Sequence, residues 1–169
     1  MGARSKTARM ALVLLVLLVA GVLASSGYQA FATTRDLEKY PAPGQLIDVG
    51  GYRMHIHCIG EGNPTVVMEA GMSGWSTDWL LVQPEVAEVT RACAYDRAGY
   101  GWSDEGPRPQ DSQQVATALN RLLAEAGIEG EIILVGHSLG GVFAQYYARE
   151  YPEQVVGLVL VDSVHPRQS

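Results

Sequence analysis

The stretch Glu131–Tyr147, EIILVGHSLGGVFAQYY, constrains the fold more than any other part of the sequence. Its apolar, β-branched run at 132–135 is typical of a buried strand. The pentapeptide GHSLG at 136–140 then turns sharply, and residues 142–151 carry helical spacing up to a proline. Glycines lack a Cβ, so a strand and a helix can close tightly around a residue with a strained backbone. The sequence therefore predicts a strand–turn–helix that lifts the Ser138 hydroxyl clear of the chain, at a helix N-terminus that favours negative charge.

The charge balance argues against two classes of partner. The chain has 169 residues, of which 47% are hydrophobic, with 18 acidic and 12 basic side chains. This length suits one globular domain with a core of its own. Three of the basic residues lie before position 10, so the rest of the chain has nine basic against 18 acidic side chains. A surface that acidic argues against nucleic acid or anionic lipid as the partner of the folded part.

The N-terminus has the composition of a membrane-targeting segment. Arg4, Lys6 and Arg9 precede the unbroken apolar run Met10–Ala24. A basic flank before such a run directs the chain into a membrane, with the basic end in the cytoplasm. The run is shorter than the roughly 17–25 residues of a spanning helix. The small and weakly polar residues that follow it allow a span to continue to Ala32.

Two interpretations of this segment stay open. An uncleaved signal anchor over residues 1–32 is favoured, and a signal peptide cleaved near Ala30-Phe31-Ala32, a small-x-small site, is the alternative. Both place the remaining chain outside the cytoplasm. Residues 33–44 are polar and contain prolines, which predicts a linker, and a folded domain is expected over 45–169.

The domain is expected to begin with a β-hairpin. Residues 46–49 and 52–59 flank the pair Gly50-Gly51, which supplies the positive φ angles of a tight turn. Apolar residues alternate with polar ones in the second arm, which predicts one buried and one solvent-facing side. His55 and His57 then face solvent and, with no third ligand nearby in the sequence, are not expected to bind a metal.

The remaining elements alternate between strand and helix. Strands are expected at 65–68, 92–95 and 155–161, in addition to the strand before Ser138. Helices are expected at 82–89 and from a cap at Asp111 or Ser112 to Gly127, in addition to the helix after Ser138. Such alternation predicts an α/β fold with a mostly parallel sheet and helices on both faces, preceded by the N-terminal hydrophobic helix.

Four motifs together resemble the α/β-hydrolase superfamily. In chain order they are EAG at 69–71, DRAGYGWS at 96–103, GHSLGG at 136–141 and LVLVDS at 158–163. The likeness covers about residues 41–166 and is strongest to single-domain esterase, lipase and peptidase-like members with an N-terminal membrane segment. It implies hydrolysis of ester or related acyl bonds in a small-molecule substrate, with no cofactor or metal.

The resemblance also implies roles for individual residues. Ser138 is the expected nucleophile, which separates this chain from dehalogenases and epoxide hydrolases that use aspartate there. The backbone N–H groups of Leu139 and Met72 are the expected oxyanion donors. The sequence Glu69-Ala70-Gly71 departs from the His-Gly that many relatives carry before the second donor. By the same resemblance His137 is a packing or hydrogen-bonding residue beside the nucleophile rather than the base, and the loop 96–103 is structural.

A serine nucleophile needs a base, itself oriented by a carboxylate. After Ser138 the chain offers Glu150, Glu153 and Asp162 as acids and His165 as the one histidine. The two glutamates are expected at the far end of the helix after Ser138. Asp162 with His165 is therefore the remaining pair, and in the family's usual arrangement both groups would lie in later strands and loops.

The expected fold is incomplete without those later elements. The chain is therefore interpreted as a truncated hydrolase that lacks its acid and base, with the strand 155–161 as an open, aggregation-prone edge. A non-catalytic protein that keeps the fold as a binding or interaction module is the alternative. An acyltransferase or peptidase would share the same machinery. The sequence does not specify the oligomeric state.

The two cysteines are expected to be neighbours by the same resemblance. In this fold the strand holding Cys58 usually pairs antiparallel with the strand holding Cys93. A disulfide between them is slightly favoured outside the cytoplasm. Two separately buried thiols are the alternative.

Overall fold

The computed structural model describes residues 2–163, and within them the side chains of residues 9–36 and 38–163. The chain divides into two compact units, Met1–Pro41 and Ala42–Ser169. His165, one of the residues expected near Ser138, lies outside the described residues.

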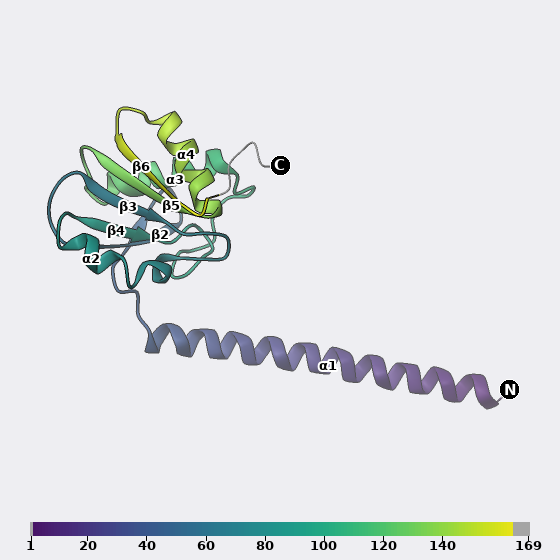
Figure 1. Ribbon diagram of the computed structural model, residues 1–169. Helices are drawn as coiled ribbons and strands as arrows, with labels where there is room; N and C mark the ends of the chain where they lie inside the picture. Colours follow the sequence, from purple (N-terminus) through teal and green to yellow (C-terminus); the bar gives the residue numbers. More distant parts are fainter. Residues whose placement is uncertain (1, 164–169) are drawn as a thin grey trace. The chain divides into compact units, whose positions relative to one another are not determined.

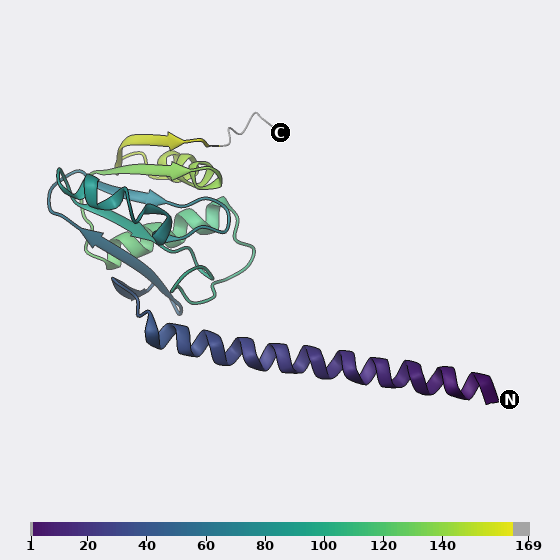
Figure 2. The same ribbon diagram turned by 60° about the horizontal axis from the view of Figure 1, so that its bottom comes forward.

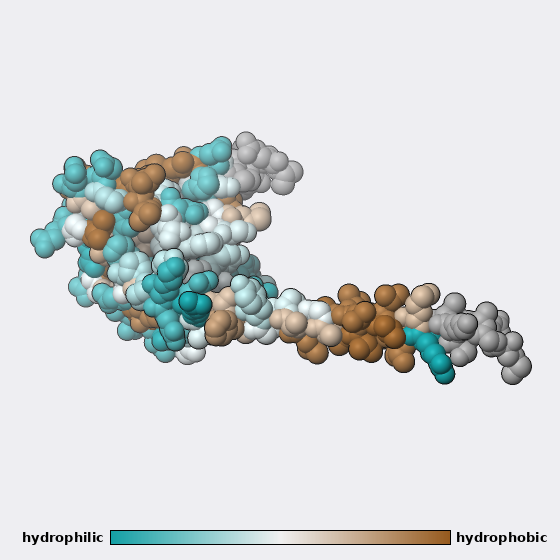
Figure 3. Space-filling view, turned by 90° about the horizontal axis from the view of Figure 1, so that it is seen from below, coloured by the Kyte–Doolittle hydropathy of each residue, from teal (hydrophilic) through white to brown (hydrophobic). Residues whose placement is uncertain are grey.

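The first unit is one long helix, α1 (Gly2–Lys39). Its stretch Arg9–Asp36 is long and apolar enough to cross a membrane. Figure 3 shows hydrophobic side chains covering the visible face of the middle of this helix. The helix continues past Ala32 and so includes the first part of the predicted linker.

The second unit is built on a six-stranded mixed sheet in the order β1-β2-β4-β3-β5-β6 (Figure 1). The strands β3, β4, β5 and β6 run parallel to one another, whereas β1 and β2 form an antiparallel hairpin whose strand β2 pairs antiparallel with β4. The predicted, mostly parallel sheet is confirmed. The bounds of the strands are β1 Gln45–Asp48, β2 Arg53–Ile59, β3 Thr65–Glu69, β4 Ala92–Tyr95, β5 Ile132–His137 and β6 Val155–Val161.

Helices cover both faces of this sheet, as Figure 2 shows. Helices α3 (Ser112–Glu125) and α4 (Leu139–Glu150) pack on one face through a core that includes Val67 and Tyr95. The short helices η1 (Ser76–Trp79) and α2 (Gln83–Ala87) pack on the other through Met68 and its neighbours. Successive residues of a strand point to opposite faces, so β3 and β4 supply both cores.

The helix ends follow local sequence signals, with three differences from the prediction. The Asp111 carboxylate caps α3 by accepting a hydrogen bond from the Gln114 N–H at 2.9 Å, and Gly127 follows the helix with φ +64°. Helix α4 begins at Leu139, directly after Ser138, rather than at residue 142. The helix expected at 82–89 is confined to α2, and η1 was not anticipated.

The prediction that both histidines of β2 face solvent is wrong for His55, whose side chain is completely buried. The cause is the loop after β4, which lies along this strand. The His55 N–H donates to Ser103 Oγ at 2.9 Å, and the Trp102 ring lies 5.0 Å from the imidazole. His57 is half-buried. Alternation along a strand predicts two faces, but it does not show which segments cover them.

The two cysteines form the predicted disulfide. Cys58 in β2 and Cys93 in β4 are directly paired in the antiparallel register, with Cα atoms 4.0 Å apart. The link joins the hairpin to the parallel part of the sheet. It therefore closes a loop between residues 35 positions apart in the chain.

The expected open edge is present at β6, which pairs with β5 alone among the described strands. Its apolar side chains are largely exposed, with Val156 at 52% and Val159 at 47% of their full accessible surface. An uncovered β-branched edge of this kind is a site where other strands can pair.

Candidate active site

Ser138 lies at the junction between β5 and α4 with an unusual backbone conformation. Its φ is +51° and its ψ is −120°, a combination that L-residues rarely adopt. The turn is tied to the neighbouring strand because the Ser138 N–H donates to the Val161 carbonyl at 3.0 Å. The Gly141 N–H donates back to the Ser138 carbonyl at 3.1 Å. The predicted strand–turn–helix around this serine is confirmed.

The glycines of the motif allow the strand and the helix to approach each other. A Cβ placed on Gly136 would lie 2.5 Å from the Gly141 Cα, closer than any real Cβ contact. A Cβ on Gly140 would overlap the Ala70 carbonyl oxygen in the loop after β3. Any larger residue at these positions would push the helix away from the sheet.

The loop after β3 lies directly beside Ser138. A Cβ built on Gly71 would be 3.3 Å from the Ser138 Cβ, which places the backbone of Gly71, the residue before Met72, against the turn. Among the described residues, the N–H groups of Met72 and Leu139 donate to no acceptor. Leu139 is the first residue of α4, where free N–H groups carry a partial positive charge. The two predicted oxyanion donors therefore belong to the two segments that meet at Ser138.

A buried charged cluster supports this loop, and it was missed in the sequence analysis. Glu69, at the end of β3, is paired with Arg97 and accepts a hydrogen bond from the Tyr95 hydroxyl. Both charged side chains are at least 95% buried. Burial raises the pKa of Glu69 to about 7, against the opposing effect of Arg97. The available signal was Glu69 itself, a charged residue at the end of an otherwise apolar strand.

The Asp96 carboxylate holds the loop 96–104 together. One carboxylate oxygen accepts the Ser76 N–H at 2.7 Å, and the other accepts the Trp102 N–H at 2.9 Å and lies 3.0 Å from His55 Nδ1. Burial raises the pKa of Asp96, but the hydrogen bonds from His55, Trp102 and Ser76 together outweigh it and lower the pKa. These contacts fit the predicted structural role of the loop.

The candidate acids Asp162, Glu150 and Glu153 do not all lie at the end of the sheet where Ser138 is found. Asp162 directly follows β6, is exposed and has φ +45°. Because its neighbour Val161 accepts the Ser138 N–H, Asp162 lies at the same end of the sheet as the serine. Glu150 and Glu153 are exposed near the opposite end of α4 and are not brought to the site.

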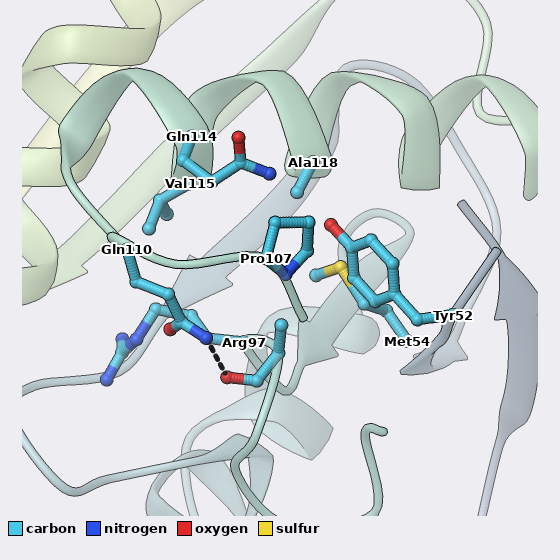
Figure 4. Close-up of a pocket in the computed structure, with 9 residues that line it drawn as sticks. Tyr52, Met54, Arg97, Pro107, Gln110, Gln114, Val115 and Ala118 are labelled. Carbon is cyan, nitrogen blue, oxygen red and sulfur yellow. Dashed lines mark hydrogen bonds between the residues drawn. The ribbon is translucent and has the colours of Figure 1, made fainter. Parts of the chain in front are cut away.

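Two of the cavities along the described residues differ greatly in size. His137, Val161, Asp78, Trp79 and Val82 line an open surface cavity of about 330 Å³ on the η1 side of the sheet. The other cavity lies beside α3, where Figure 4 shows Tyr52, Met54 and Pro107 packed together and Gln110 bonded to the Ala98 carbonyl. Its remaining space is only about 10 Å³, which is about the size of one water molecule.

Comparison with known proteins agrees with this geometry. Residues 64–169 match the alpha/beta hydrolase fold family. An uncharacterised protein of Schizosaccharomyces pombe is 32% identical over 152 residues, which cover 72% of this chain and 28% of that protein. The solved structure of the epoxide hydrolase CorEH superposes with a TM-score of 0.64 at 29% identity, covering 74% of this chain and 44% of that one.

An esterase from Exiguobacterium antarcticum gives a TM-score of 0.66 at 26% identity, covering 73% of this chain and 46% of that one. The chain thus spans less than half the length of the curated relatives it matches. The match over residues 64–169 includes both segments that meet at Ser138. This protein therefore belongs to the alpha/beta hydrolase fold family.

Proposed function

We propose that this chain supplies the nucleophile and the oxyanion donors of a serine hydrolase that cleaves ester or related acyl bonds of small molecules. The observation that carries the proposal is the backbone of Ser138, whose φ of +51° holds the residue at the N-terminus of α4 and against the loop after β3. Within residues 2–163 the N–H groups of Leu139 and Met72 have no acceptor, and a strained serine beside such groups has no evident use in a protein that only packs.

The proposed reaction proceeds through an acyl-enzyme. The Ser138 oxygen attacks the acyl carbon while its proton passes to a base, and the N–H groups of Leu139 and Met72 bind the resulting oxyanion. When this oxyanion intermediate collapses, the bond to the alcohol breaks, and the alcohol leaves with the proton that the base had taken from Ser138. Water then attacks the acyl-enzyme and releases the carboxylic acid. His165, with Asp162 to orient it, is the base that this chain itself offers.

The test is the hydrolysis of the ester p-nitrophenyl butyrate by the full chain in detergent micelles. The Ser138→Ala variant is compared with Ser112→Ala, a control at the start of α3. Turnover that disappears only in Ser138→Ala supports the proposal. Labelling of wild-type Ser138 by a fluorophosphonate, detected by mass spectrometry, reports the nucleophile even where turnover is slow. Equal behaviour of the wild type and Ser138→Ala in both assays would instead favour a binding or interaction module.

We further propose that α1 is a single-pass anchor with its N-terminus in the cytoplasm. Arg4, Lys6 and Arg9 precede the apolar segment, and lysine and arginine flanks remain on the cytoplasmic side. Protease added outside sealed right-side-out vesicles should digest the second unit and spare a tag at the N-terminus. A cleaved signal peptide would instead release the second unit from the vesicles, and a digested N-terminal tag would reverse the proposed orientation.

A further inference from the structure

Arg97, a buried side chain from the loop after β4, binds several carbonyl groups of the loop after β3. Arg97 Nη1 donates to the Ala70 carbonyl at 2.6 Å, and Nη2 donates to the Gly71 carbonyl at 2.6 Å. Nη2 also lies 3.5 Å from the Gly74 carbonyl. One guanidinium therefore binds carbonyl groups on both sides of Met72.

The geometry of the peptide bond turns this contact into an orientation. The Gly71 carbonyl and the Met72 N–H belong to the same peptide group, which is planar and, when trans, directs them to opposite sides. The peptide between these two residues is not among the cis bonds of the described chain. By binding the Gly71 oxygen, Arg97 directs the Met72 N–H away from itself. The Ser138 Cβ lies 3.3 Å from a Cβ built on Gly71, beside this peptide.

Arg97 is itself fixed on several sides. Glu69 pairs with its charge from β3, and the Tyr95 hydroxyl holds the same carboxylate. The rings of Tyr100 and Phe143 lie 4.9 and 5.5 Å from the guanidinium carbon. Phe143 belongs to α4, the helix that begins directly after Ser138. The guanidinium therefore contacts both segments that meet at the serine.

The energetics of a buried pair favour a positioning role over a purely stabilising one. Removing two charges from water costs about as much as their attraction returns, so a buried pair contributes little net stability. A planar guanidinium that is already oriented by a carboxylate binds two carbonyls with little further loss of freedom. Lysine would carry the same charge, but it could not bind both carbonyls in this fixed fork.

We propose that Arg97 is the positioning residue for the oxyanion donor at Met72, with Glu69 and Tyr95 holding its guanidinium in place. The inference rests on the proposed function, because it assigns a purpose to a donor of that same site. Arg97 acts through the peptide and does not touch the substrate.

The first measurement is the rate of fluorophosphonate labelling of Ser138 as a function of probe concentration, by the full chain in detergent micelles. In this reaction the serine oxygen forms a bond to phosphorus, fluoride leaves, and the hydroxyl proton is released with it as hydrogen fluoride. The phosphoryl oxygen occupies the oxyanion position. The variants are Arg97→Lys and Arg97→Met, with the exposed Arg108→Met as the control.

Because the donor acts on charge that develops during the reaction, the maximal labelling rate constant should fall about 10²-fold in both Arg97 variants. The probe concentration at half-maximal rate should stay the same. A general loosening of the fold would change both quantities. Equal maximal rate constants in Arg97→Met and the wild type would overturn the proposal.

The second measurement needs no reaction at Ser138. Hydrogen exchange of the Gly74 amide, whose N–H donates to the Gly71 carbonyl at 3.2 Å, should be at least tenfold faster in both Arg97 variants, with exchange in α3 unchanged. Unchanged exchange of this amide would also overturn the proposal. If the fluorophosphonate does not label Ser138 in the wild type, the proposed function fails. Hydrogen exchange then still decides whether Arg97 holds the loop after β3. Arg97→Lys keeps the test valid if Arg97→Met does not fold.

Discussion

Gly140 in α4 lies directly against Ala70 in the loop after β3, so close that a Cβ on Gly140 would overlap the Ala70 carbonyl oxygen. The contact links the helix that follows Ser138 to the loop that carries Met72. A change at this one position should therefore affect both stability and reactivity.

We expect Gly140→Ala to destabilise the folded chain by about 1–3 kcal/mol, because backbone atoms on both sides must move to admit the methyl group. The displaced loop should also slow fluorophosphonate labelling of Ser138. Urea unfolding followed by tryptophan fluorescence measures the first effect. Gly27→Ala in α1, where a Cβ meets nothing within 4 Å, is the control. A Gly140→Ala variant as stable as this control would contradict the tight contact.

The backbone of Ser138 predicts an unusual order of stability among its variants. Glycine adopts φ +51° without the steric cost that any side chain brings, so Ser138→Gly should be about 1 kcal/mol more stable than Ser138→Ala. At Ser112, in the first turn of α3, the order should reverse because alanine favours a helix by about 1 kcal/mol over glycine. Thermal unfolding of the four variants checks this, and the same order at both positions would argue against strain at Ser138.

Glu69 predicts how stability depends on pH. Its pKa is about 7 in the folded chain against an ordinary 4.5, so between these pH values the folded state keeps a proton that the unfolded chain has lost. Stability from this group is therefore greatest below pH 4.5 and is lost as the pH rises to about 7. The loss is on the order of 3 kcal/mol.

The Glu69→Gln variant lacks this titration, so its stability relative to the wild type should increase as the pH rises through that range. Urea unfolding of both proteins at a series of pH values measures the difference. Glu125→Gln, which changes an exposed carboxylate of α3, is the control. A stability difference that stays constant from acidic to neutral pH would show that the folded chain does not hold this proton.

The disulfide between Cys58 and Cys93 should make a large contribution to stability. The two residues are 35 positions apart, and a loop of that size predicts a loss of roughly 3–4 kcal/mol when the link is removed. The Cys58→Ala/Cys93→Ala double variant should therefore unfold at a lower urea concentration than the oxidised wild type. Reductant should lower the urea concentration at which the wild type unfolds toward that of the double variant. It should leave the urea concentration at which the variant unfolds unchanged. Insensitivity of the wild type to reductant would contradict this prediction.

The sequence by itself determined the elements that depend on short-range signals. Side-chain periodicity and glycines without a Cβ predicted three of these elements. They are the strand–turn–helix around Ser138, the capped helix α3 and the strand at 92–95. The order of these elements along the chain was enough to predict a mostly parallel sheet, because parallel neighbours require helical crossovers. The roles expected for Met72, Leu139, Asp162 and His165 came from resemblance and stay predictions.

Only the tertiary structure decided which polar side chains are buried and what they bind. Alternation along β2 predicted an exposed His55, but the loop after β4 covers it completely. The contacts of Arg97 with Glu69, Ala70 and Gly71 join residues that are 26 to 28 positions apart, and no local pattern specifies such a pairing. The reason is physical: the free energy of a buried charge depends on the partners that other segments bring to it, and those partners are set by the packing of the whole sheet.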